Sequence, residues 1–184
     1  MGGLNSMRTL ILLGTLFIAG CASTPIEAIV TEQTLAGWKA GNQQDLGRGK
    51  GTIVELIPVS ESINQWQHLA TIQFLEGEHR TPKLLMEALE ANMKTRCPTS
   101  TDWRVISEEP HSVTYEWRIH SCTGQENQTE ISRILQGNDG LHRIAYTEKG
   151  DTMSPENREF WMKVLGKAYV AKGGPSHPIS LPSQ

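Results

Sequence analysis

Residues 52–74, TIVELIPVSESINQWQHLATIQF, decide the fold of this 184-residue chain. Thr52–Ile57 is β-branched and apolar and is followed by Pro58, a pattern typical of a β-strand that ends there. Gln67–Phe74 alternates between two faces, which indicates a second strand. Ser60–Trp66, between them, predicts a short capped turn of helix. The stretch therefore predicts two strands that the rest of the chain covers or extends.

Two helices are predicted by the same start signal, a Ser or Thr followed by proline. The first begins at Thr81-Pro82 and ends at Cys97-Pro98, and the second begins at Ser154-Pro155 and ends at Gly173-Gly174-Pro175. Apolar residues recur at helical spacing in both, namely Leu85, Ala88, Leu89 and Met93, then Phe160, Trp161, Val164, Leu165, Ala168 and Tyr169. Both helices are therefore amphipathic, and the second should lie on the sheet.

Further strands are expected at 103–107, 112–121, 129–136 and 141–148, with turns near Gln125 and Asn138. One face of the last three strands is expected to form the core: Tyr115, Trp117, Ile119, Ile131, Leu135, Ile144 and Tyr146. The opposite face would carry Glu116, Arg118, His120, Glu130, Ser132 and Arg143. Earlier in the chain, residues 34–41 predict a strand or a helical turn. Residues 47–51 favour a hairpin loop over a phosphate loop, because they open a strand rather than a helix.

These elements predict an α+β fold, a mostly antiparallel β-sheet packed by two or more amphipathic helices, in one domain at 34–171. Its central motif is Glu55-Leu56-Ile57-Pro58 followed by Glu61, Trp66, Leu69, Thr71 and Gln73. This motif resembles a pattern of uncharacterised proteobacterial envelope proteins, which are similar to the PsbP-like fold. The resemblance covers residues 37–169 and implies a sandwich of helices on the sheet. It carries no known activity and transfers no functional residue.

Residues 1–21 have the features of a targeting signal. Arg8 precedes the apolar run Thr9–Ala19, which is shorter than the roughly 20 residues of a membrane-spanning helix but suits a secretory signal. The run ends Leu16-Phe17-Ile18-Ala19-Gly20-Cys21, which resembles the bacterial lipoprotein signal. The resemblance implies a signal peptide at 1–20 and a Cys21 that carries a diacylglyceryl group and an N-acyl chain such as palmitate. Residues 21–33 would then form a tether.

Other interpretations of the N-terminus remain open. Met1–Ser6 also matches a myristoylation pattern, but it lies directly before the signal peptide. Translation from Met7 would place Arg8 immediately before the apolar run. Ala22, rather than Asp, after Cys21 resembles lipoproteins that are sorted to the outer membrane. We therefore expect a lipid-anchored envelope protein at the periplasmic face, in the outer rather than the inner membrane. The tail 172–184 is expected to be disordered.

Cys97 and Cys122 remain as a pair if Cys21 carries lipid. In an oxidising compartment the expectation is a disulfide, which would contribute roughly 3 kcal/mol through loop closure. Two independent thiols or half of a metal site are the alternatives, although the spacing lacks the close cysteine pairs of zinc sites.

Candidate functional residues lie on the polar sheet face. Glu116, Arg118 and His120 share one side of a strand, and Glu130 and Arg143 are expected across from them. Such a group can bind an anion or perform acid–base chemistry. The alternative is ordinary cross-strand charge pairing on a solvated face.

Several function classes lack support. The net charge of −3 and the pI near 6.1 argue against a nucleic-acid partner. The six histidines show no metal-site spacing, and there is no Gly-x-Ser-x-Gly elbow, so no metal, cofactor or catalytic residue is expected. The leading hypothesis is a non-enzymatic accessory module that binds an envelope protein. The alternative is a periplasmic binder of a small anion at Glu116, Arg118, His120 and Arg143, and an enzyme at that face is less favoured.

Overall fold

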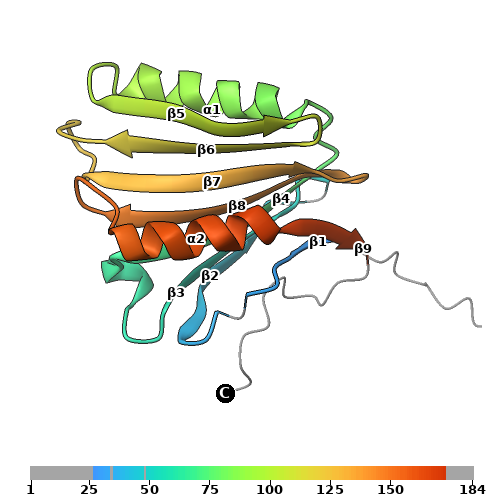
Figure 1. Cartoon of the computed structure of the whole chain (residues 1–184), viewed down its shortest axis with the longest axis horizontal. Helices are drawn as coiled ribbons and strands as arrows, with labels where there is room; N and C mark the ends of the chain where they lie inside the picture. Colours follow the sequence, from blue (N-terminus) through green and yellow to red (C-terminus); the bar gives the residue numbers. More distant parts are fainter. Residues whose placement is uncertain (1–26, 34, 48, 173–184) are drawn as a thin grey trace, which may run out of the picture.

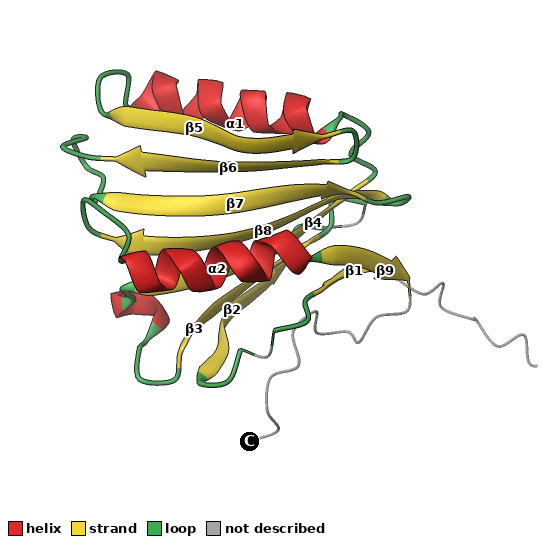
Figure 2. Cartoon of the chain, in the orientation of Figure 1, coloured by secondary structure: helices red, strands yellow, loops and turns green. Residues whose placement is uncertain are grey.

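The computed structural model describes residues 27–33, 35–47 and 49–172. The strands are β1 (Glu27–Val30), β2 (Trp38–Asp45), β3 (Thr52–Pro58), β4 (His68–Glu76), β5 (Thr101–Glu109), β6 (Ser112–Ile119), β7 (Gln128–Gln136), β8 (Gly140–Lys149) and β9 (Tyr169–Lys172). The helices are the short 3₁₀ helix η1 (Ile63–Gln65), α1 (Pro82–Arg96) and α2 (Pro155–Lys167). Figure 2 shows these elements by type.

Seven strands form one antiparallel sheet in the order β2-β3-β4-β8-β7-β6-β5. The two strands predicted within residues 52–74 are β3 and β4, which pair with each other in this sheet. β1 and β9 form a separate antiparallel pair beside the end of α2 (Figure 1). The predicted α+β class, a mostly antiparallel sheet packed by helices, is confirmed.

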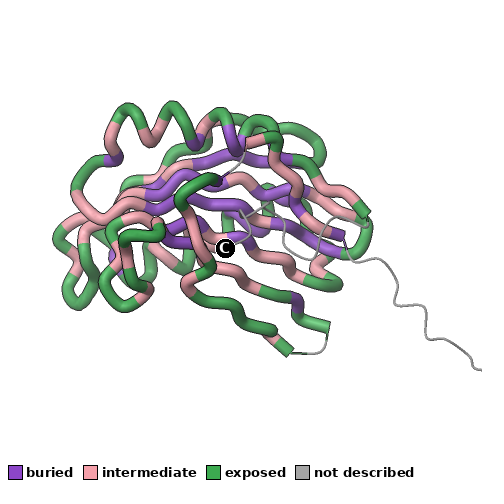
Figure 3. The backbone as a smooth tube through the Cα atoms, turned by 90° about the horizontal axis from the view of Figure 1, so that it is seen from below, coloured by how far each residue is buried: buried purple, intermediate pink, exposed green. Residues whose placement is uncertain are grey.

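Each face of the sheet has its own core because the two helices pack on opposite faces. The core under α1 contains Leu85, Met86, Cys97, Val113, Tyr115, Trp117, Ile119, Ile134 and Leu141. The core under α2 contains, among others, Leu56, Ile72, Ile131, Leu135, Ile144, Tyr146, Trp161, Val164 and Leu165. In Figure 3 the buried residues gather in the central strands, and the outer sides of the loops are exposed.

The single core face expected for β6, β7 and β8 is wrong for β6. Trp117 pairs with Glu130, and Glu116 pairs with Ile131. Paired residues point to the same face, so Tyr115, Trp117 and Ile119 face α1, while Ile131, Leu135, Ile144 and Tyr146 face α2. A shift of one residue in β6 against β7 produces this difference, because side chains alternate with a period of two.

The ends of the helices follow their sequence signals with one exception. Thr81 and Ser154 cap α1 and α2, accepting hydrogen bonds from Leu84 N and Asn157 N. The second helix was expected to continue until Gly173, but it ends at Lys167, and Tyr169–Lys172 forms β9. β9 pairs with β1, so residues 27–30 belong to the fold rather than to the expected tether at 21–33. Cys21 and the tail 173–184 lie outside the described residues.

The predicted disulfide between Cys97 and Cys122 is confirmed. It joins the residue that follows α1 to the loop between β6 and β7, with the two Cα atoms 5.6 Å apart. Cys97 is buried in the core under α1. The bond therefore fixes the C-terminal end of α1 to the sheet.

Both edge strands of the sheet are interrupted. The register of β2 against β3 shifts between Ala40 and Asn42, and that of β5 against β6 shifts between Val105 and Ser107. Bulges in edge strands hinder pairing with another chain. Binding of a partner by addition of a strand at either edge is therefore disfavoured.

Glu27 fastens β1 to the hairpin between β7 and β8. Its buried carboxylate accepts hydrogen bonds from Asn138 N (3.0 Å), Asn138 Nδ2 (2.7 Å) and Asp139 N (2.9 Å). His142 Nε2 lies 3.6 Å from Glu27 Oε2. Burial by itself raises the pKa of Glu27, but the hydrogen bonds from Asp139 and Asn138 and the contact with His142 outweigh it, so its pKa lies below the ordinary value of 4.5.

Glu27→Gln is expected to lower the free energy of unfolding by about 2 kcal/mol at pH 7, because an amide NH₂ would face backbone donors. A carboxyl whose pKa is lowered by folding stabilises the protein above its unfolded pKa, and this contribution is lost as the pH falls through the folded pKa. The difference in the free energy of unfolding between the wild type and Glu27→Gln should therefore become smaller as the pH falls below 4.5. Urea unfolding between pH 3 and pH 7 measures it, and a constant difference would contradict the assignment.

Candidate functional site

The surface of β5 and β6 on the α2 side of the sheet is open to solvent; we call it the open face. α2 packs on β7 and β8, and α1 packs on the other side of β5 and β6. Side chains on the open face are well exposed, 57% for Asp102 and 63% for Arg104. Among the described elements, none covers this surface.

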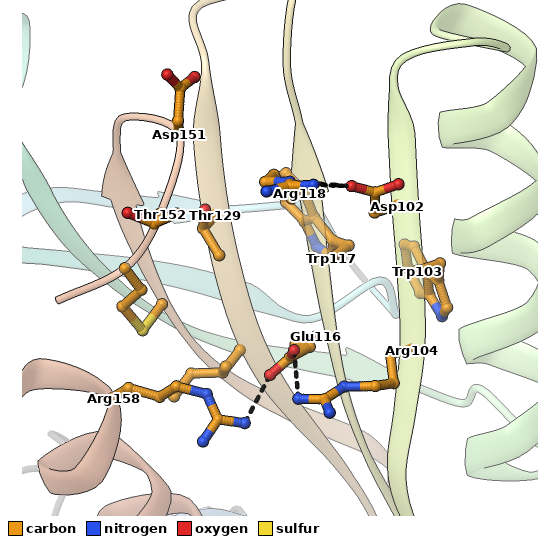
Figure 4. Close-up of a pocket in the computed structure, with 12 residues that line it drawn as sticks. Asp102, Trp103, Arg104, Glu116, Trp117, Arg118, Thr129, Asp151, Thr152 and Arg158 are labelled. Atoms are coloured by element: carbon orange, nitrogen blue, oxygen red, sulfur yellow. Dashed lines mark hydrogen bonds and ion pairs between the residues drawn. The ribbon is translucent and has the colours of Figure 1, made fainter. Parts of the chain in front are cut away.

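A groove with a volume of about 340 Å³ crosses the open face toward the first turn of α2 (Figure 4). Its walls come from β5, β6, β7, the loop after β8 and α2. The lining residues are Asp102, Trp103, Arg104, Glu116, Trp117, Arg118, Thr129, Ile131, Asp151, Thr152, Met153 and Arg158.

Cross-strand ion pairs dominate the groove. Asp102 of β5 is opposite Arg118 of β6, and Arg118 Nε donates to Asp102 Oδ2 at 2.9 Å. The hydrogen bond from Arg118 lowers the pKa of Asp102 below its usual value of 3.8. This carboxylate therefore stays ionised throughout the neutral range.

The second ion pair is shared by three residues. Glu116 of β6 accepts from Arg104 Nη2 on β5 at 2.5 Å and from Arg158 Nη2 on α2 at 2.8 Å. In Figure 4 its carboxylate lies between the two guanidinium groups, one on each side. Glu116 thus connects the edge strand, the neighbouring strand and the helix.

The groove has an excess of hydrogen-bond donors. A guanidinium carries five N–H groups. Arg104 and Arg158 each donate one hydrogen bond to Glu116, and Arg118 donates two to Asp102. The Thr129 hydroxyl is also buried without a hydrogen-bond partner among the described residues. Groups rich in acceptors, such as carboxylates and phosphates, suit this lining.

The structure separates the residues that were expected to converge. Glu116 and Arg118 line the groove, but Arg143 lies on the α1 side of the sheet, because it pairs with Ile134, which faces α1. His120 follows β6, and its Nδ1 lies 3.9 Å from Asp102 Oδ2, outside the residues that line the groove. The expected joint site of Glu116, Arg118, His120 and Arg143 is therefore corrected to a groove without Arg143 and His120.

Arg143 instead belongs to a buried polar cluster with Glu130. Glu130 accepts from Arg143 Nη2, Trp117 Nε1 (2.9 Å), Ser132 Oγ (2.5 Å) and Thr147 Oγ1 (3.0 Å). Burial by itself lowers the pKa of Arg143, but Glu130 and Tyr115 outweigh it and raise the pKa above its ordinary value. This satisfied network stabilises the fold beside α1 and is separate from the groove.

Six polar groove residues were missed by sequence reasoning: Asp102, Arg104, Thr129, Asp151, Thr152 and Arg158. Asp102 and Arg104 gave no clear signal, because they lie opposite Arg118 and Glu116 only through the bulge between Val105 and Ser107, which the sequence does not reveal. Arg158 gave no signal either, since only tertiary packing brings α2 to the open face.

Two features are absent from the described part of the chain. No cluster of three or more His, Cys, Asp or Glu side chains in it is arranged to hold a metal ion. None of the helices observed there combines the length and the apolar character needed to cross a bilayer.

The described residues thus form an α+β fold with a charged groove that is open to solvent. No protein-family model and no curated protein matches the chain. Among solved structures it is similar to cyanobacterial PsbP (CyanoP) from Synechocystis sp. PCC 6803, with 10% identity and a TM-score of 0.40. The alignment covers 86% of this chain and 99% of that chain. The likeness concerns the fold alone.

Proposed function

We propose that this protein is a lipid-anchored accessory module of the bacterial cell envelope, which binds a polypeptide segment of a partner protein in the groove on its open face. The single observation that carries the proposal is the groove itself, a donor-rich hollow on a sheet face that the described elements leave exposed. The partner segment should be acidic, because the uncommitted groups are mostly guanidinium N–H donors.

A polypeptide fits this surface better than a small molecule does. Sites for small ligands usually enclose most of the ligand surface, whereas Asp102 and Arg104 stand at an open rim and remain more than half exposed. The bulges in β2 and β5 disfavour partner binding through the sheet edges. Both observations favour recognition by the face of the sheet.

The anchor follows from the lipoprotein-like signal that ends at Cys21. Two or more acyl chains hold a protein stably on a membrane. Confinement to a membrane surface also raises the effective concentration of the module near a partner in the same envelope. A weak interface on the open face is then sufficient.

A photo-crosslinking amino acid in place of Thr152, at the groove, tests the partner assignment in intact cells. The same residue in place of Lys94, on the exposed side of α1, is the control. We expect one envelope protein to crosslink from position 152 and not from position 94. The purified partner should then bind the wild-type protein and fail to bind an Arg104→Glu, Arg158→Glu variant whose melting temperature is preserved.

The result that contradicts the proposal is a crosslink that forms equally from position 94 or that survives the double charge reversal. Absence of any crosslink from the groove, with the protein present in the membrane fraction, also contradicts it.

Cys21→Ser is expected to move the protein from the membrane fraction to the soluble periplasmic fraction, because the thioether cannot form. Incorporation of labelled palmitate should be lost at the same time. Ser23→Ala, two residues away, is the matched control and should leave both unchanged. A Cys21→Ser protein that remains membrane-bound and labelled would contradict the anchor.

A periplasmic binder of a small anion is the second candidate, and the spare guanidinium donors favour it. This candidate differs from the first in its ligand. If the protein is an anion binder, free acetate or phosphate should bind in the groove as tightly as a peptide does.

A further inference from the structure

We infer that Glu116 occupies a carboxylate-binding subsite between Arg104 and Arg158, and that an acidic side chain of the partner segment exchanges with it. The inference rests on the proposed function, because it names the group of the partner that the groove receives. It also gives Glu116 a role of its own, as an internal occupant that competes with the ligand.

The geometry of the subsite is that of a bound carboxylate. Glu116 Oε1 accepts from Arg104 at 2.5 Å, and Oε2 accepts from Arg158 at 2.8 Å, so each oxygen is held by a different guanidinium. Guanidinium groups are suited to carboxylates because their N–H donors form charge-assisted hydrogen bonds with the carboxylate oxygens. An incoming carboxylate finds the same two donors from the open side of the groove.

An incoming carboxylate can replace Glu116 because Arg104 and Arg158, which bind Glu116, are accessible to solvent. The side chains of Arg104 and Arg158 are 63% and 39% exposed, and that of Glu116 is 23% exposed. Ion pairs with exposed partners are weak, since water solvates the separated charges. The buried carboxylates Glu27 and Glu130, by contrast, are enclosed by donors and offer no such access.

The local charge also favours an anion at this end of the groove. Arg104 and Arg158 carry two positive charges against one negative charge on Glu116, while Arg118 and Asp102 balance each other. Asp151 lies at the opposite rim, and its Oδ1 accepts a hydrogen bond from Asn127 Nδ2. The cationic end of the groove is therefore the subsite.

The test is a titration of the full-length protein, in nonionic detergent, with the peptide acetyl-Gly-Ser-Glu-Ser-Gly-amide. Binding is followed by NMR through the Nε–Hε signals of the arginines. The matched peptide carries Gln instead of Glu, and sodium acetate serves as the free carboxylate. We expect the Glu peptide to bind more tightly than both, and to bind Arg104→Gln, Arg158→Gln about tenfold more weakly than wild type.

Glu116→Gln gives the decisive result. Removal of the internal occupant should tighten binding of the Glu peptide about fivefold, whereas a purely structural Glu116 predicts unchanged or weaker binding. Glu108→Gln removes a carboxylate of β5 that pairs with Lys83 outside the groove, and should change the affinity less than about twofold. Equal gains in both variants would show a general charge effect and overturn the inference.

The two proposals fail in different ways. If acetate binds as tightly as the peptide and gains equally from Glu116→Gln, the subsite stands but the polypeptide occupant is wrong. If a partner crosslinks from position 152 while Glu116→Gln leaves peptide binding unchanged or weaker, the proposed function stands and the exchange is wrong.

Discussion

Arg143→Met should lower the free energy of unfolding by about 3–5 kcal/mol, because it leaves the Glu130 carboxylate buried without its charge partner. The side chains of Glu130 and Arg143 are only 7% and 15% exposed. Trp117, Ser132 and Thr147 would still donate to Glu130, but neutral donors do not balance a buried charge. Urea unfolding at pH 7 measures the loss.

A second substitution tests whether the unpaired charge of Glu130 causes the loss of stability in Arg143→Met. In Glu130→Gln, Arg143→Met the buried charge is absent, so part of the lost stability should return. Lys163→Met, which breaks the exposed pair of Lys163 with Glu159 on α2, is the matched control and should cost less than about 1 kcal/mol. A loss in Arg143→Met no greater than that of the control would contradict the prediction.

Replacing both Cys97 and Cys122 with alanine is expected to lower the free energy of unfolding by about 3 kcal/mol, mainly because the unfolded chain regains the freedom of the closed loop. The two residues are 25 positions apart. Reduction of the wild-type protein with dithiothreitol should lower the free energy of unfolding by the same amount. The two losses should differ only through the changed packing where alanine replaces the buried Cys97.

The local consequence should appear at the end of α1. Hydrogen exchange of the amides in the last turn, which includes Lys94 and Arg96, should accelerate more than that of α2. Equal acceleration in both helices would indicate a global effect only. Wild-type stability in the double variant would contradict a structural role for the bond.

The starts of both helices were predictable from sequence because their signals are local. A hydroxyl side chain followed by proline both caps the first turn and presets its backbone, and Thr81 and Ser154 do so in the structure. The end of α2 was not predictable in this way. Tyr169 continues the apolar stripe of the helix, but pairing of β9 with β1 fixes it in a strand.

The faces of β6 were assigned wrongly relative to β7 and β8 because these central strands are buried on both faces. Alternation identifies an inner face only where the other face is polar. The loop from His120 to Asn127 gives no tight-turn signal to fix the register, and the disulfide within it constrains the chain without revealing which residues pair. As a result Glu116 and Arg118 were placed correctly together, while Arg143 was assigned to the wrong face.

The fastening of Glu27 also determines how the molecule bears mechanical force. Any pull transmitted from the N-terminal side of the described chain reaches Glu27 first, at the outer end of β1, where it pairs with Lys172. A strand loaded at its end unzips one hydrogen bond at a time. Here the bonds of the Glu27 carboxylate to Asn138 and Asp139 transfer the load to the hairpin of β7 and β8 in the main sheet. We therefore expect a pull on residue 27 to load β7 and β8, at the centre of the sheet, before the pairing of β1 with β9 is lost.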